Sequence, residues 1–326
     1  MISHRQILMF TVLLGAAASF VCAPAPAQTA RIEIVSIQTT TLTDEQFLNG
    51  VREGKSVAIA GELRIPRPGT ERLPAVVFLH GSGGVNASHD RWAQEMLALG
   101  IATFIMDSFT GRGIVQTSTD QAQLGRLAMI VDAYRALELL ARHPRIDPQR
   151  IALMGFSRGG QSALYASVRR FQRMHGLAGL EFAAYIPFYA ACNTTFRDDG
   201  DVTDRPIRIY HGLADDYVPI GPCRPYVARL RAAGKDVILT EYPNAHHAFD
   251  NPANPKPIKA ALSQSTRSCT LREDQNGSVI NSKTGQPFTY KDPCVELGPT
   301  LGYNAEAHAA SVKAVKTFLA STFRLP

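Results

Sequence analysis

The chain has 326 residues, of which 45% are hydrophobic and 19% are charged, the balance of an ordinary globular protein with one large α/β domain or two small ones. The formal net charge is +6. Because the basic residues are scattered and form no long cluster, we interpret the chain as a basic soluble protein and exclude a nucleic-acid-binding one.

The first residues predict a secretory signal peptide over 1–27. His4 and Arg5 precede an apolar run over 7–21, and Ala25-Pro26-Ala27 follows it. A basic start, an apolar middle and an A-x-A end are typical of such peptides, so we expect cleavage after Ala27. A retained membrane anchor is the alternative, although the run is short for a span. We therefore predict a secreted or periplasmic protein without stable membrane insertion.

The rest of the chain alternates predicted strands and helices. Residues 31–37 and 57–65 largely alternate apolar and polar side chains, which indicates antiparallel strands. Residues 75–79 are continuously apolar, as in a strand buried on both faces. Further strands are expected over 101–106, 151–154, 182–189, 206–210 and 237–242, and helices over 91–99, 120–142, 161–171, 226–233 and 305–320. This order predicts an α/β fold: a mostly parallel central sheet with helices on both faces and the two antiparallel strands at one edge.

A serine stands at one junction between strand and helix. The stretch Gly155-Phe156-Ser157-Arg158-Gly159 joins the 151–154 strand to the 161–171 helix. A turn this sharp strains the backbone of its central residue and needs small neighbours, which is the physical basis of the G-x-S-x-G nucleophile elbow. We predict that Ser157 is a nucleophile; a glycine-rich turn with a capping serine is the plainer alternative.

A nucleophilic serine needs a base, and the base needs an acid to orient it. Asp215 follows the 206–210 strand, at the strand end where open α/β sheets keep their sites, with Asp216 as the alternative acid. His247 follows the 237–242 strand, with His246 as the alternative base. The order Ser, Asp, His is that of a hydrolase with this elbow, so we predict a triad of Ser157, Asp215 and His247.

Two backbone amides are expected to stabilise the oxyanion. One is the amide of Arg158, directly after the nucleophile, and the other is the amide of Ser82 in the glycine-rich loop after the 75–79 strand, with Gly83 as the alternative. The same glycines match neither G-x-x-x-x-G-K nor a spaced G-x-G-x-x-G, which argues against phosphate binding.

Four cysteines remain after the signal peptide is removed: Cys192, Cys223, Cys269 and Cys294. An even number in an oxidising compartment predicts two disulfides, for which three pairings exist. Cys269 and Cys294 both lie in a long stretch rich in turn residues at about 251–303 and would close a local loop within it. No C-x-x-C occurs, so a structural zinc site is not expected, and we expect no cofactor.

Six stretches carry a resemblance to a known family: HGSGG at 80–84, DSFTGRG at 107–113, GFSRGG at 155–160, HGLADDYVP at 211–219, YPNAHHAF at 242–249 and LGYNAEAHAAS at 301–311. From about residue 55 to 322 the chain resembles the α/β-hydrolase superfamily, nearest to its dienelactone hydrolase branch. The resemblance implies the same triad of Ser157, Asp215 and His247. Dienelactone hydrolases carry a cysteine nucleophile, so the serine moves the expected activity from lactones toward carboxylic esters.

The fold that this resemblance implies also places two cysteines. Cys192 would follow the 182–189 strand and Cys223 the loop of Asp215, on neighbouring strands of one sheet edge. We therefore favour the pairs Cys192–Cys223 and Cys269–Cys294.

Two weaker signals have competing interpretations. Arg112 is a candidate for binding a substrate carboxylate, although an ion pair with a nearby acid is favoured. The acidic residues of 198–201 suggest calcium, although a solvated loop is favoured because no spaced ligand series follows.

The sequence thus predicts an exported serine esterase that acts on small-molecule esters. One domain is expected over 28–326, with a disulfide-bridged excursion at about 251–303. The alternatives are a serine peptidase of the prolyl-oligopeptidase type, an acyltransferase, and a non-catalytic binding protein on a hydrolase scaffold.

Overall fold

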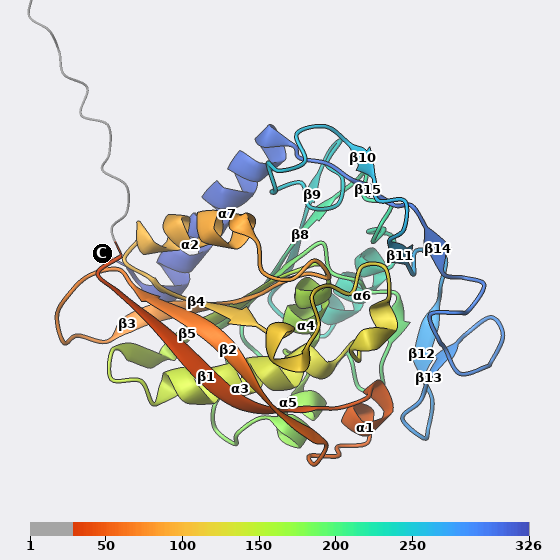
Figure 1. Cartoon of the computed structure of the whole chain (residues 1–326), viewed down its shortest axis with the longest axis horizontal. Coiled ribbons are helices and arrows are strands. Elements are labelled where there is room, and N and C mark those ends of the chain that lie inside the picture. Colours follow the sequence, from red (N-terminus) through yellow and green to blue (C-terminus); the bar gives the residue numbers. More distant parts are fainter. Residues whose placement is uncertain (1–28, 326) are drawn as a thin grey trace, which may run out of the picture.

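The computed structural model describes residues 29–325, whose centre is a twisted sheet covered by helices (Figure 1). In the described residues the sheet has eight strands in the order β1-β2-β4-β3-β5-β6-β8-β9. Their bounds are Arg31–Thr41 (β1), Lys55–Ile65 (β2), Leu73–Leu79 (β3), Ala102–Asp107 (β4), Ile146–Phe156 (β5), Ala184–Phe188 (β6), Ile207–Gly212 (β8) and Val237–Tyr242 (β9). The pairs β1–β2 and β2–β4 are antiparallel and all others are parallel, so the predicted sheet and its antiparallel edge are confirmed.

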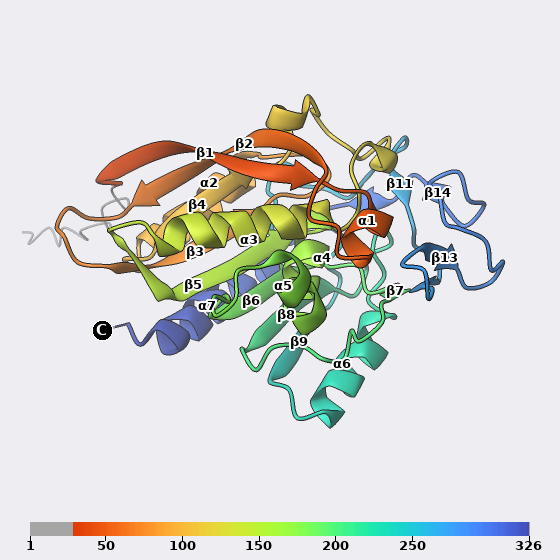
Figure 2. The ribbon, with the colours of Figure 1, turned by 90° about the horizontal axis from the view of Figure 1, so that it is seen from below.

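Helices cover both faces of this sheet (Figures 1 and 2). The helices are Asp44–Leu48 (α1), Ala87–Leu97 (α2), Ala128–Ala141 (α3), Arg158–Tyr165 (α4), Arg169–His175 (α5), Cys223–Ala232 (α6) and Ala305–Phe323 (α7), with single 3₁₀ turns at Thr110–Arg112 and Gln121–Gln123. Helices α2 and α7 bury their apolar residues against one face, and α3 to α6 against the other. None of the helices within 29–325 is long and apolar enough to cross a membrane. The expected signal peptide and its cleavage site lie outside the described residues.

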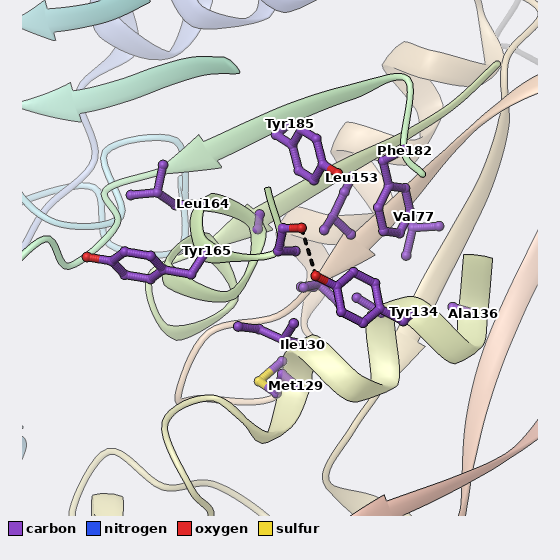
Figure 3. Close-up of a cluster of buried hydrophobic side chains, with 14 of the residues drawn as sticks. Val77, Met129, Ile130, Tyr134, Ala136, Leu153, Leu164, Tyr165, Phe182 and Tyr185 are labelled. Atoms are coloured by element: carbon purple, nitrogen blue, oxygen red, sulfur yellow. Dashed lines mark hydrogen bonds between the residues drawn. The ribbon is translucent and has the colours of Figure 1, made fainter. Parts of the chain in front are cut away.

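The two faces explain the continuous apolar runs. Successive residues of β3 point to opposite sides, so Val76 belongs to the core under α2 and α7, and Val77 to the core under α3. Figure 3 shows Val77 and Leu153 of adjacent strands in one cluster with Ile130 and Tyr134 of α3. In the same cluster the Tyr134 hydroxyl donates a 2.8 Å hydrogen bond to the Ala166 carbonyl and so satisfies a polar group inside the core.

Two predicted helices differ from the observed ones. The helix expected over 120–142 begins only at Ala128, because the preceding loop is held by side chains: the Leu127 amide donates to Asp44 and the Gln121 amide to Gln264. The helix expected over 161–171 is broken into α4 and α5. Val168 has an extended backbone and forms a β-bridge with Val202 there, which a continuous helix would not allow.

The segment at 251–303 is an ordered excursion of short paired strands. They are Ile258–Lys259 (β10), Gln264–Ser265 (β11), Leu271–Glu273 (β12), Val279–Asn281 (β13), Glu296–Leu297 (β14) and Thr300–Leu301 (β15), with Thr194–Thr195 (β7) joining β12. The disulfides are Cys192–Cys223 and Cys269–Cys294, so the favoured pairing is confirmed. The second disulfide closes the loop inside the excursion, and the first ties the end of β6 to the start of α6.

Candidate active site

Ser157 occupies a strained elbow between β5 and α4. Its φ of 55° and ψ of −113° lie in a region that serine rarely adopts. The surrounding glycines permit the turn: a Cβ on Gly155 would lie 2.1 Å from the Gly159 carbonyl oxygen, and a Cβ on Gly159 would lie 2.3 Å from the Leu79 carbonyl oxygen. The Ser157 amide donates to the Phe188 carbonyl at 3.0 Å and so anchors the elbow to β6.

Adding one methyl group at the elbow is expected to destabilise the fold. In Gly159→Ala the new Cβ clashes with backbone, which cannot move aside as a side chain would, so we expect a loss of about 3 kcal/mol and a Tm lower by roughly 5–10 °C. Gly221→Ala is the matched control, because a Cβ there meets nothing within 4 Å. Thermal unfolding measures both variants, and equal Tm values would contradict this account of the elbow.

His247 joins the elbow to an acid. It follows β9, and its Nε2 lies 2.9 Å from Ser157 Oγ while its Nδ1 lies 2.8 Å from Asp215 Oδ2. Because an ionised carboxylate only accepts, Nδ1 carries the proton and Nε2 is left to accept from the serine hydroxyl. Hydrogen bonds of this length and order are those of a nucleophile, a general base and an orienting acid.

Asp215 is held as a buried carboxylate. Its Oδ1 accepts from the amides of Tyr217 and Val218 at 2.9 and 2.8 Å. Burial acts to raise the pKa of Asp215, but the adjacent His247 and His211 outweigh burial and lower that pKa below its usual range. The carboxyl is therefore ionised at neutral pH, as the orientation of His247 requires.

Two tyrosine rings hold the His247 imidazole. The centroids of Tyr189 and Tyr217 lie 4.6 and 4.7 Å from it. The Tyr189 hydroxyl donates to Asp250 at 2.9 Å, and the same carboxylate accepts from Trp92 Nε1 at 2.7 Å. The sequence pattern did not single out these tyrosines, although Tyr189 directly follows β6, the strand-end position that favoured Asp215.

The alternative acid and base lie elsewhere. Asp216 accepts from the amide and hydroxyl of Thr300 at 2.7 and 3.0 Å, so it anchors the excursion. Nδ1 of His246 has no hydrogen-bond partner among the described residues. Of the four candidates, the structure brings only Asp215 and His247 into the chain of hydrogen bonds to Ser157.

The glycine-rich loop after β3 lies against the elbow. A Cβ on Gly81 would be 3.3 Å from Ser157 Cβ. His80 fixes the loop: its Nε2 accepts from the Ser108 amide at 3.1 Å and its Nδ1 donates to the Gly81 carbonyl at 2.8 Å. Burial lowers the pKa of His80, so the ring stays neutral in this arrangement. Within residues 29–325 the amides expected to serve the oxyanion, those of Ser82 (or Gly83) and Arg158, donate to no protein acceptor.

The structure accounts for the two weaker sequence signals. The Arg112 side chain is 4% exposed, and its guanidinium pairs with both oxygens of Asp132 at 2.8 and 2.9 Å. The favoured interpretation of Arg112 as an ion-pair partner is confirmed, and Arg112 lines neither of the two cavities beside Ser157. Asp199 pairs with Arg229 at 2.8 Å, and no cluster of three acidic, histidine or cysteine residues suited to a metal occurs in the described part of the chain.

Two cavities adjoin Ser157. The larger, about 230 Å³, is lined by His247, Tyr189 and Ala248, together with Leu301 of the excursion. The smaller, about 50 Å³, is lined by polar groups, among them Arg126, Arg158, Gln161, Gln264 and Tyr290. Ser82 and Tyr217 border both. Because the excursion contributes to both cavities, it shapes the space around the nucleophile.

The sheet order and the elbow together define the α/β-hydrolase fold. Residues 60–323 match the model of the dienelactone hydrolase family, and the chain belongs to that family. Membership supports a hydrolase and confirms the resemblance seen in the sequence motifs.

Solved structures of the same fold bear related names. A dienelactone hydrolase-like promiscuous phosphotriesterase, P91, from metagenomic libraries superposes with a TM-score of 0.59 at 19% identity, covering 89% of this chain and 98% of that one. A putative dienelactone hydrolase from Klebsiella pneumoniae has a TM-score of 0.55 at 14% identity, with 88% and 99% covered. At these identities the similarity concerns the fold.

Two curated proteins match shorter stretches. The uncharacterized peptidase YuxL of Bacillus subtilis is 24% identical over 144 residues, which are 36% of this chain and 22% of YuxL. Acyl-protein thioesterase 1 of Gibberella zeae is 31% identical over 107 residues, which are 32% of this chain and 43% of the thioesterase. The matched part of the chain thus spans less than half the length of either relative.

Proposed function

We propose that this chain is a serine hydrolase that cleaves carboxylic esters through an acyl-enzyme. The observation that carries the proposal is the continuous chain of hydrogen bonds from Ser157 Oγ through the His247 ring to Asp215. Membership of the dienelactone hydrolase family supports hydrolysis, and a lactone is itself a cyclic ester.

Each group has one task in this mechanism. Ser157 Oγ attacks the ester carbonyl while His247 Nε2 takes its proton, and Asp215 stabilises the imidazolium that forms. The amides of Ser82 and Arg158 donate to the tetrahedral oxyanion. His247 then gives the proton to the leaving alcohol, and water attacks the acyl-serine by the same route in reverse.

We also propose that the protein is exported. The support is the sequence pattern over residues 1–27 and the two disulfides, which persist in oxidising compartments. The intact mass of protein recovered from an exporting host should correspond to a chain that begins at Gln28 and has no free thiol. A mass that includes Met1 would overturn the export proposal.

A fluorophosphonate probe tests the catalytic proposal directly. We expect one equivalent to attach to Ser157, identified by peptide mass spectrometry, because only an activated serine attacks such a probe quickly. Hydrolysis of p-nitrophenyl acetate should disappear in step with labelling. A peptide p-nitroanilide and an added alcohol as acyl acceptor, run beside the ester, distinguish a peptidase and an acyltransferase. A protein that takes up no label would instead support the binding-protein alternative.

A further inference from the structure

The smaller cavity beside Ser157 holds buried donors that no protein group satisfies. Nη1 of Arg126, Nε of Arg158 and Nε2 of Gln161 have no hydrogen-bond partner in the described residues. These side chains are only 6%, 7% and 6% exposed, and all three line the cavity. Buried polar groups are normally paired, so three unpaired donors on residues that line one small cavity point to a ligand group that accepts from them.

No carboxylate of the described residues pairs directly with the two arginines of this cavity. Nη2 of Arg126 donates to the Thr194 hydroxyl at 2.9 Å, and the hydrogen bonds of Arg158 go to neutral acceptors of the 121–125 loop. Neither guanidinium forms an ion pair within 4.0 Å of a carboxylate in residues 29–325. The carboxylate that acts on both from further away is Asp44, and burial raises its pKa. A buried pair of arginines without a close acid favours an anion.

The position of the smaller cavity indicates which part of the ester would occupy it, the acyl part or the leaving alcohol. The leaving alcohol must lie near His247, which donates its proton, and His247 lines only the larger cavity. The smaller cavity is bordered by Ser157 and Arg158, so the acyl part of the substrate enters it. Its volume of about 50 Å³ has room for a few water molecules, or for one small polar group such as a carboxylate.

We propose that the cavity bounded by Ser157, Arg126 and Gln161 binds a carboxylate on the acyl side of the substrate, so that the preferred substrates are half-esters of short dicarboxylic acids. This inference rests on the proposed esterase function and names its substrate class. Arg126 is the specificity residue: its free Nη1 meets the carboxylate, while Arg158 fixes the wall of the cavity through its contacts with the 121–125 loop.

The test compares two esters of nearly equal shape. Monoethyl succinate ends in a carboxylate and ethyl levulinate ends in a methyl ketone, so the ratio of their kcat/KM values isolates the charge. We expect the wild type to prefer the half-ester at least tenfold, as a charge-assisted hydrogen bond in a buried site implies. The preference should fall to about one in Arg126→Gln and remain in Arg142→Gln, an arginine at the end of α3 that lies outside both cavities. A wild type without preference, or a preference that survives Arg126→Gln, would overturn the proposal.

A binding measurement separates this inference from the catalytic one. Calorimetry of succinate with Ser157→Ala should detect binding that Arg126→Gln in the same background abolishes. The amount of folded enzyme cancels in the ratio of the two kcat/KM values, and the binding signal is divided by the concentration of folded protein. A variant with altered stability is therefore still informative. Binding of succinate without turnover of either ester would support the subsite and count against the esterase. Turnover of both esters without preference, together with no binding of succinate, would support the esterase and count against the subsite.

Discussion

Ser157→Ala is expected to lower kcat for p-nitrophenyl acetate by about 10⁴-fold or more, because no acyl-enzyme can form without the hydroxyl and the remaining amides supply only residual catalysis. The backbone strain at this position belongs to the elbow and not to the side chain, so the variant should keep the wild-type Tm to within a few degrees. Steady-state kinetics and thermal unfolding measure the two quantities on the same samples.

Ser162→Ala is the matched control for the loss of a hydroxyl. Ser162 lies one turn further along α4 and donates to the Arg158 carbonyl at 3.1 Å, so its hydroxyl faces neither cavity. We expect its kcat to remain within about threefold of the wild type. Equal activity of Ser157→Ala and the wild type would mean that Ser157 is a turn residue and that the chemistry lies elsewhere.

The contacts that make the elbow at Ser157 tight can be predicted from the local sequence only in part. The glycines around Ser157 can be recognised in the sequence, because three small residues flanking one hydroxyl are unusual outside a tight turn. The group that they accommodate cannot be recognised there: Gly159 is required by the Leu79 carbonyl, which comes from a strand about eighty positions earlier in the chain. Local spacing thus predicts that a turn is tight, and only the assembled sheet shows what makes it tight.

Position at strand ends explains why Asp215 and His247 could be predicted and Arg126 could not. Parallel strands deliver their following residues to one edge, so chain order and strand ends bring the acid and base toward Ser157. Arg126 lies in a loop expected to be helical, and it reaches the cavity because Asp44 caps the start of α3 at Leu127 and stops the helix there. That contact joins residues 83 positions apart, so the helical periodicity of the sequence cannot predict it.

The excursion was also predictable only in part, because its contact with the sheet joins residues far apart in the chain. Its composition predicted a departure from the strand and helix rhythm, and its cysteines predicted a local closure. The sequence did not indicate that Asp216, the neighbour of the candidate acid, would hold Thr300 of the excursion. The loop after β8 therefore presents Asp215 to His247 and Asp216 to Thr300, so these two acids link the candidate site to the excursion.

His247→Ala should reduce kcat for the same ester by about 10⁴-fold or more, because the serine proton then has no acceptor at 2.9 Å. The adjacent variant His246→Ala removes an imidazole of the same loop that makes no hydrogen bond to Ser157 or Asp215, and we expect a change of less than about threefold.

The double variant Ser157→Ala/His247→Ala makes the comparison stricter. Groups that act as one unit lose their effect together, so the double variant should be no slower than Ser157→Ala alone. A further large loss would mean that His247 acts on something other than the serine, and a loss confined to His246→Ala would move the base to the neighbouring ring. Because the imidazole of His247 is packed against two tyrosine rings, its replacement also leaves a cavity. The Tm of each variant shows whether the loss of activity exceeds any loss of folded protein.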